Sequence, residues 1–114
     1  MPFSVSKEFE FAAAHFLTKY HGKCENLHGH NYRLVVTVTG PLNSDDVVVD
    51  FVDLKQLVKQ HVVDLLDHTN LNDRFKNPTC ELVAKWIYEQ LQPHCSVDSV
   101  QLWETSTSSV TYHA

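Results

Sequence analysis

Residues 3–16 read Phe-Ser-Val-Ser-Lys-Glu-Phe-Glu-Phe-Ala-Ala-Ala-His-Phe, with apolar and polar side chains in near alternation over the first nine positions. Because successive side chains of a strand point to opposite faces of a sheet, this pattern predicts a strand with one buried face and one face toward water. His15 falls near the end of this strand on the apolar side. A histidine there is either a packed core residue or a ligand at a strand end.

Three more strands are expected further along the chain. The segment from about His30 to Gly40 is rich in the β-branched residues that fit a pleated surface. Residues 97–104 and 109–113 are expected to form the third and fourth strands, and residues 47–49 a short strand-like segment after a turn.

Two helices are expected between the second and third strands. The first runs from Asp50, as N-cap, through about residue 66, and the second begins with Asn77 as N-cap and Pro78 at the first helical position. This order predicts one α+β domain over residues 1–114, with a four-stranded antiparallel sheet and two helices on one face. The free edges and second face of such a sheet favour oligomerisation.

The composition excludes several classes of protein. A net charge of −5 and a pI near 5.8 argue against a general nucleic-acid or membrane-surface binder, although a few local cations suffice for a small anionic ligand. We expect no membrane span and no secretory leader. The three cysteines are odd in number and lack CxxC spacing, which indicates reduced thiols in a cytoplasmic protein rather than a disulfide framework.

The segment Cys24-Glu25-Asn26-Leu27-His28-Gly29-His30 is the strongest chemical signal in the chain. If His28 and His30 lie on an extended segment, both side chains point to the same face and can hold one metal ion. Zinc accepts neutral imidazoles, and catalytic zinc sites use three protein ligands, so His15 is the candidate for the third. Cys24 is better placed as a reactive thiol beside the metal. The alternative is two ordinary strand histidines.

Three carboxylates and one further histidine are candidate site residues, but each of them also has a purely structural explanation. Asp67 beside His68 either sets an imidazole tautomer or belongs to a surface helix end. Glu81 in the first turn of a helix suits the helix dipole, with or without a function. Glu104, at the end of a strand, either holds the N–H groups of a ligand or ends the strand in water.

Six motifs agree, in order, with one enzyme family. They are His15, Cys24-x3-His28-Gly29-His30-Asn31-Tyr32, Asp50-Phe51-x-Asp53-Leu54-Lys55, Leu66-Asp67-His68-x-x-Leu71-Asn72, Asn77-Pro78-Thr79-x-Glu81 and Trp103-Glu104-Thr105. In this series, from about residue 3 to residue 106, the chain resembles the 6-pyruvoyltetrahydropterin synthase family. The three residues between Cys24 and His28 resemble the spacing in its bacterial branch, the 6-carboxy-5,6,7,8-tetrahydropterin synthases.

The resemblance implies a tunnelling fold (T-fold), assembled as a homohexamer from two trimers with active sites at subunit interfaces. The implied reaction is the zinc-dependent conversion of 7,8-dihydroneopterin triphosphate to 6-carboxy-5,6,7,8-tetrahydropterin, with loss of acetaldehyde and triphosphate, on the route to queuosine. The implied zinc ligands are His15, His28 and His30. The implied catalytic residues are Cys24, Asp67 and His68, and the implied pterin-binding residues are Glu104, Glu81 and Thr105.

Two alternatives remain open at this point. A pyruvoyl-forming enzyme would use the same zinc and thiol but stop after triphosphate elimination and isomerisation. A non-catalytic zinc-binding oligomer would explain His15, His28 and His30, but it gives no reason for Cys24 or for the Asp67–His68 pair.

Overall fold

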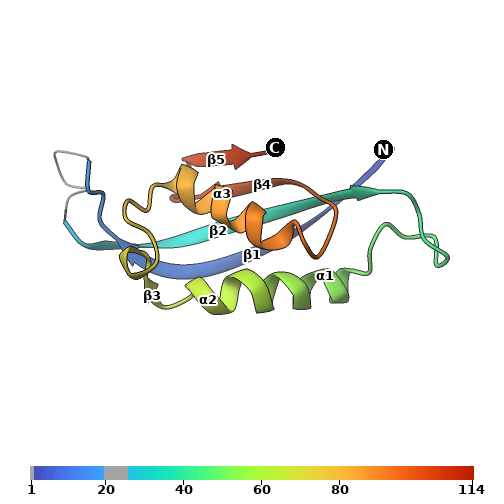
Figure 1. The fold of residues 1–114 in the computed structure, drawn as a ribbon, viewed down its shortest axis with the longest axis horizontal. Coiled ribbons are helices and arrows are strands. Elements are labelled where there is room, and N and C mark those ends of the chain that lie inside the picture. Colours follow the sequence, from blue (N-terminus) through green and yellow to red (C-terminus); the bar gives the residue numbers. More distant parts are fainter. Residues whose placement is uncertain (1, 20–25) are drawn as a thin grey trace.

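The computed structural model describes residues 2–19 and 26–114 of the chain. Within these residues the strands form one five-stranded sheet in the spatial order β3-β1-β2-β4-β5 (Figure 1). The strands are β1 (Phe3–His15), β2 (His28–Gly40), β3 (Thr69–Asn70), β4 (Val97–Trp103) and β5 (Ser109–Tyr112). The four long strands that were predicted are therefore present, with ends that shift by one or two residues.

The β1–β2 ladder is the longest strand pairing in the described sheet. The two strands pair antiparallel along their whole length, from Phe3 opposite Gly40 to His15 opposite His28. β4 pairs antiparallel with β2, and β5 pairs antiparallel with β4. The ladder accounts for the elongated shape, with principal extents of 52 × 24 × 23 Å.

β3 is the strand that the sequence did not predict. It contains only two residues, Thr69 and Asn70, and pairs parallel with Ala13 and Ala14 of β1. Two residues are too few for an alternation of apolar and polar side chains to be visible in a sequence. The sheet is therefore mostly antiparallel, with one short parallel edge.

The first predicted helix is present as one continuous rod of three pieces, α1 (Phe51–Val58), a π-helical turn η2 (Lys59–Val63) and α2 (Asp64–Leu66). The Asp50 side chain accepts a hydrogen bond from the Val52 amide, so the predicted N-cap is confirmed. Buried residues recur every fourth position, and in an α-helix each such step turns the side chain by about 40° away from the core. The wider π turn reduces this drift. The fully buried members of the series are Leu54, Val58, Val62 and Leu66.

The second helix, α3 (Cys80–Leu91), starts later than predicted. Its N-cap is Thr79, whose hydroxyl accepts from the Leu82 amide, and not Asn77. The Asn77 side chain instead accepts a hydrogen bond from the Thr18 amide at 3.0 Å. Pro78 therefore lies before the helix rather than at its first position.

The predicted strand-like segment at residues 47–49 is wrong, because residues 48 and 49 form a bend and residue 47 has no regular structure. The Asn43 side chain accepts from the Asp45 and Val47 amides and closes a tight loop just before it. The neighbouring ends of β1 and β2 are already paired with each other.

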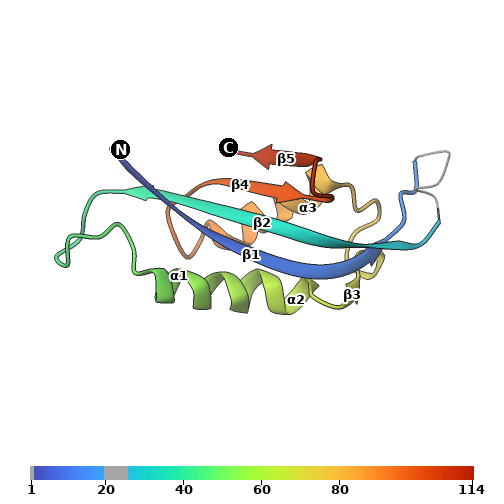
Figure 2. The ribbon, with the colours of Figure 1, turned by 180° about the vertical axis from the view of Figure 1, so that it is seen from behind.

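Both helical segments cover the same face of the sheet. Figure 1 shows α3 in front of the strands, and Figure 2, from behind, shows the strands in front of α3. The described core lies between them and includes Leu34 and Val36 of β2, Leu102 of β4 and Ile87 of α3. In the described part of the chain no helix is both long and apolar enough to cross a membrane.

Candidate metal centre and substrate pockets

Three histidines meet where β1 ends and β2 begins. His15 lies opposite His28 in the ladder, and His30 lies two residues further along β2 on the same face. One ring nitrogen from each residue lies within 4.8 Å of the others, so the three rings could hold a metal ion. The predicted period-2 geometry of His28 and His30 is confirmed by the ladder.

Hydrogen bonds fix the tautomers of two of these rings. The Nδ1 atom of His15 lies 2.8 Å from the Pro78 carbonyl oxygen, and that of His28 lies 2.7 Å from the Asn26 carbonyl oxygen. Because a carbonyl oxygen only accepts, each Nδ1 carries the proton and each Nε2 presents a lone pair. These two Nε2 atoms face each other at 3.2 Å. Two acceptors at this distance need a cation between them.

The third ring supports the same conclusion. Nε2 of His30 is buried and has no hydrogen-bond partner among the described residues. Burial lowers the pKa of His30, although the Glu104 carboxylate opposes this, so the imidazole stays neutral at neutral pH. A four-coordinate zinc with bonds of 2.0–2.1 Å to nitrogen separates its ligand atoms by about 3.3 Å. The donor set fits a metal such as zinc, and the 3.2 Å between Nε2 of His15 and Nε2 of His28 is close to this spacing.

Glu104 and Tyr32 lie beside this metal cluster. Glu104 follows β4, with its amide bonded to the Ser108 carbonyl, and its carboxylate oxygens lie 3.6 Å from Nε2 of His30 and 3.9 Å from Nε2 of His15. The buried Tyr32 hydroxyl lies 3.3 Å from Nδ1 of His15. The proximity of Tyr32 to His15 was missed, although Tyr32 shares the parity of His28 and His30 on β2.

Three hollows have His30 or Glu104 among their lining residues. The first, of about 490 Å³, is lined by His30 and His68, and the second, of about 530 Å³, by His30, Glu104 and Thr105. The third, of about 330 Å³, is lined by Glu104, Glu81 and Cys80. His30 and Glu104 therefore connect the three hollows. The predicted candidates Glu81, Glu104 and Thr105 all line this region.

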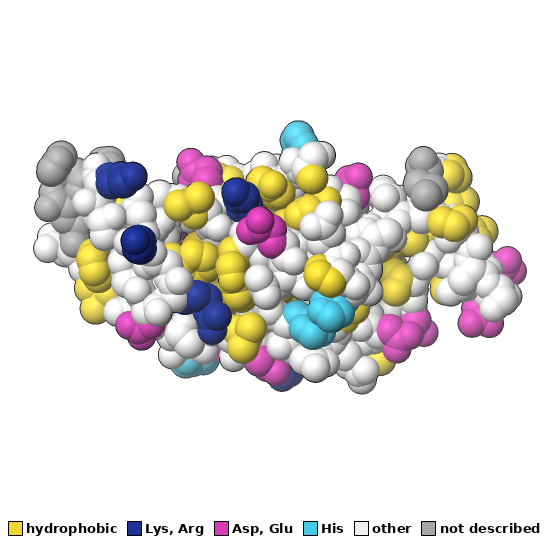
Figure 3. All heavy atoms as spheres, in the orientation of Figure 1, with side chains coloured by type: hydrophobic (Ala, Val, Ile, Leu, Met, Phe, Trp, Pro, Cys, Tyr) yellow, Lys and Arg dark blue, Asp and Glu magenta, His cyan; other side chains and the backbone are white. Residues whose placement is uncertain are grey.

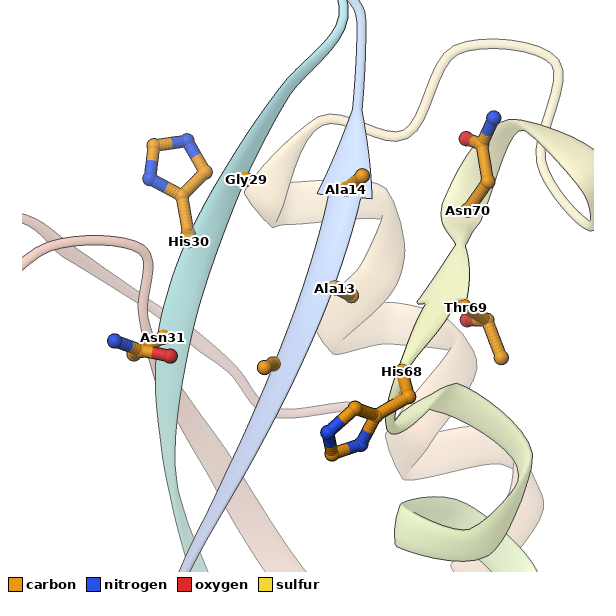
Figure 4. A pocket seen from close by; sticks show the side chains of 9 residues that line it. Ala13, Ala14, Gly29, His30, Asn31, His68, Thr69 and Asn70 are labelled. Carbon is orange, nitrogen blue, oxygen red and sulfur yellow. The ribbon is translucent and has the colours of Figure 1, made fainter.

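Asp67 and His68 form a hydrogen-bonded pair beyond β1. One oxygen of Asp67 accepts from the Ala12 amide at 2.9 Å, and the other lies 3.0 Å from Nδ1 of His68. The first of these contacts is the main cause of the lowered pKa of Asp67. His68 adopts a positive φ of 60°, an uncommon conformation for a non-glycine residue. Figure 4 shows His68 and His30 on opposite sides of β1, with Ala13 and Ala14 between them.

Two cysteines bear on the site, Cys24 by prediction and Cys80 by its position. Cys24, the predicted catalytic thiol, lies outside the described residues. Cys80 is buried at the start of α3, where burial raises the pKa of its thiol to about 12. Because the thiolate is the reactive form, Cys80 is a packing residue on the wall of the third hollow.

The comparison with protein families decides the relationship. The model of the family described as 6-pyruvoyl tetrahydropterin synthase matches residues 4–114 of the chain. The chain belongs to this family. The sequence resemblance is therefore confirmed.

Relatives within the 6-pyruvoyl tetrahydropterin synthase family are similar over nearly the whole chain. The 6-carboxy-5,6,7,8-tetrahydropterin synthase of Haemophilus influenzae is 36% identical over 96% of this chain and 98% of its own. The enzyme of the same name from Synechocystis is 38% identical over 95% of this chain and 91% of its own. The structure of Caenorhabditis elegans 6-pyruvoyl tetrahydropterin synthase superposes with a TM-score of 0.88 at 28% identity, covering 98% of this chain and 95% of that one. The predicted T-fold is thereby confirmed.

Proposed function

We propose that this family member is a zinc-dependent carbon–carbon lyase that converts 7,8-dihydroneopterin triphosphate to 6-carboxy-5,6,7,8-tetrahydropterin, acetaldehyde and triphosphate. The observation that carries the proposal is the convergence of three imidazole nitrogens, two of them with lone pairs fixed by backbone carbonyls. Relatives with the 6-carboxy name, 36% and 38% identical over nearly the full chain, support the choice of product.

We propose His15, His28 and His30 as the zinc ligands. Zinc held there would polarise side-chain oxygens of the substrate as a Lewis acid, which acidifies the adjacent C–H bonds. The bonds from His15 to Pro78 and from His28 to Asn26 support this role, because such outer contacts hold an imidazole in the ligating tautomer.

We propose the Asp67–His68 pair as a general acid–base. Asp67 is held by the Ala12 amide and faces Nδ1 of His68, which leaves Nε2 of His68 to take or deliver a proton. The His68 side chain is 83% exposed, so Nε2 is accessible to a substrate. Cys24 is the proposed second proton-transfer group, as its place in the family motif implies.

The pterin is proposed to bind where Glu104 and Glu81 line one hollow. A carboxylate accepts two parallel hydrogen bonds, and the amino group and neighbouring ring N–H of a pterin offer such a pair. The Glu104 side chain is only 28% exposed, whereas Glu81 is exposed, so we propose Glu104 as the main anchor of the pterin. Thr105 lines the adjoining hollow.

The triphosphate requires cations on a protein of net charge −5. In the view of Figure 3 the visible Lys and Arg side chains lie over the half of the molecule nearer to the metal cluster, where Asp and Glu side chains also appear. These cations are our candidates for binding the triphosphate.

We further propose a cytoplasmic homohexamer, built from two trimers, on the route to queuosine. Within one chain His68 lines one hollow, whereas Glu81 and Glu104 line another. This separation supports active sites at subunit interfaces, where residues of two chains could complete one site. Light scattering of the zinc-loaded protein tests the assembly, and a monomer would contradict it.

The deciding experiment incubates the zinc-loaded protein with 7,8-dihydroneopterin triphosphate and identifies the products by mass. 6-Carboxytetrahydropterin together with acetaldehyde supports the proposal. A 6-pyruvoyl product would assign the protein to the alternative activity, which the likeness to the Caenorhabditis elegans enzyme favours. Absence of turnover by the verified zinc-loaded protein would leave the third candidate, a non-catalytic zinc-binding oligomer.

A further inference from the structure

Glu104 lies at the junction between the metal cluster and the proposed pterin pocket. Its two carboxylate oxygens approach two different ring nitrogens, Nε2 of His30 at 3.6 Å and Nε2 of His15 at 3.9 Å. The same side chain lines the hollow that contains Glu81 and the hollow that contains Thr105. One carboxylate therefore faces both places where a ligand would bind.

The groups that converge here are almost all acceptors. His15 and His28 present lone pairs at Nε2, because their Nδ1 protons go to the carbonyls of Pro78 and Asn26. An ionised carboxylate also only accepts. A carboxylate placed among such nitrogens is repelled unless a cation joins them, and the distances of 3.2, 3.6 and 3.9 Å are close to the spacing of about 3.3 Å between ligands of one four-coordinate zinc.

We propose that the Glu104 carboxylate is the fourth donor to the metal when no substrate is bound, and that the pterin then takes this carboxylate over and opens the fourth metal position. The exchange needs no new residue, since the same oxygens serve the metal and the pterin N–H groups in turn. It rests on the proposed function for the identity of the second ligand.

The exchange predicts that metal and pterin binding oppose each other. If the pterin removes one donor from the metal, pterin must weaken metal affinity, and by thermodynamic linkage the metal must weaken pterin affinity by the same factor. A carboxylate that only anchors the pterin would leave the two affinities independent.

The test uses the full chain, the Glu104→Gln variant and the Glu81→Gln variant as matched control. Glu81 is a carboxylate that lines the same hollow as Glu104, but it is not part of the metal cluster. Zinc dissociation constants are measured without substrate by competition with a chromophoric chelator. The visible absorption of the cobalt(II)-loaded proteins reports the donors around the metal. Circular dichroism checks that each variant is folded.

Glu104→Gln is expected to weaken zinc binding by at least about tenfold, since loss of even an outer partner of a metal site costs about 10–100-fold. Its cobalt spectrum should differ from that of the wild type, whereas Glu81→Gln should match the wild type in both measurements. Equal zinc affinities and equal cobalt spectra for all three proteins would overturn the inference.

A second arm needs no variant. Unsubstituted pterin, added to the cobalt-loaded wild type, should change the cobalt spectrum and weaken zinc affinity severalfold. Independent binding of pterin and zinc would overturn the exchange even if Glu104→Gln did not fold. Failure of the proposed function is separate, because it appears as absence of turnover of 7,8-dihydroneopterin triphosphate while these binding measurements remain as expected.

Discussion

His15 and His28 face each other across the β1–β2 ladder with their Nε2 atoms 3.2 Å apart. This relationship follows from strand register, since the two residues are direct partners at the last pair of a thirteen-residue ladder. A shift of the register by one residue would turn one of the rings to the other face of the sheet. The pairing that builds the fold therefore also builds the metal centre.

Replacing His28 by alanine should abolish tight metal binding. We expect a loss in zinc affinity of more than about 100-fold, because loss of an outer partner alone costs about 10–100-fold. Chelator competition on the purified protein measures it. His61→Ala is the control, because the His61 ring stacks on His94 outside the cluster. One tightly held zinc per chain in His28→Ala would contradict the assignment of this ligand.

Removal of zinc should destabilise the wild type. A ligand that binds only the folded protein, present at about 100 times its dissociation constant, adds about 2.7 kcal/mol to the free energy of unfolding. Urea unfolding with zinc and with excess chelator should differ by about that amount. His28→Ala provides the comparison, and an equal zinc effect in this variant would show that the stabilisation arises elsewhere.

Asp67→Asn should change how stability depends on pH. The Ala12 amide holds the pKa of the folded Asp67 below its usual value of 3.8, so the ionised carboxylate stabilises the native state above that value. This contribution is lost as the pH falls through 3.8 toward the folded pKa. Metal-free wild type and Asp67→Asn should differ most in free energy of unfolding above about pH 5 and converge in acid. A difference that stays constant from pH 3 to 7 would contradict the assigned cause. Asp98→Asn, a change at an exposed carboxylate, is the control.

His68→Gln should reduce turnover without affecting the metal. A positioned acid–base group contributes about 10²–10⁴-fold to a rate, so kcat should fall by about that factor. Zinc affinity should stay within about twofold, since β1 separates His68 from His30. Turnover and zinc content are measured on the same preparation. Unchanged kcat would remove His68 from the proposed mechanism.

Thr79→Ala should destabilise α3. The Thr79 hydroxyl accepts from the Leu82 amide at 3.2 Å, and loss of an N-cap costs about 1 kcal/mol. Thr79→Ser keeps the acceptor and should lie close to wild type in chemical denaturation. If both substitutions cost the same, the cap hydrogen bond is not the cause.

The sequence alone determined the features that depend on local pattern. Alternation located β1 and the same-face pair His28 and His30, because strand side chains have a period of two. Asp50 could be recognised as an N-cap because the amide that it caps, that of Val52, lies only two residues further along the chain. The motif order from His15 to Thr105 identified the family, which the match over residues 4–114 confirms. The roles of the individual site residues stay predictions.

Only the tertiary structure decided features that depend on competition between distant groups. Asn77 was expected to cap α3, but its side chain is used by the Thr18 amide, and Thr79 caps the helix instead. Glu104 was expected at the end of a strand, but its approach to His15 and His30 depends on β4 pairing with β2. A sequence pattern reports which side chains share a face. It does not report which distant partner claims a hydrogen-bonding group, because that is fixed when the strands and helices pack.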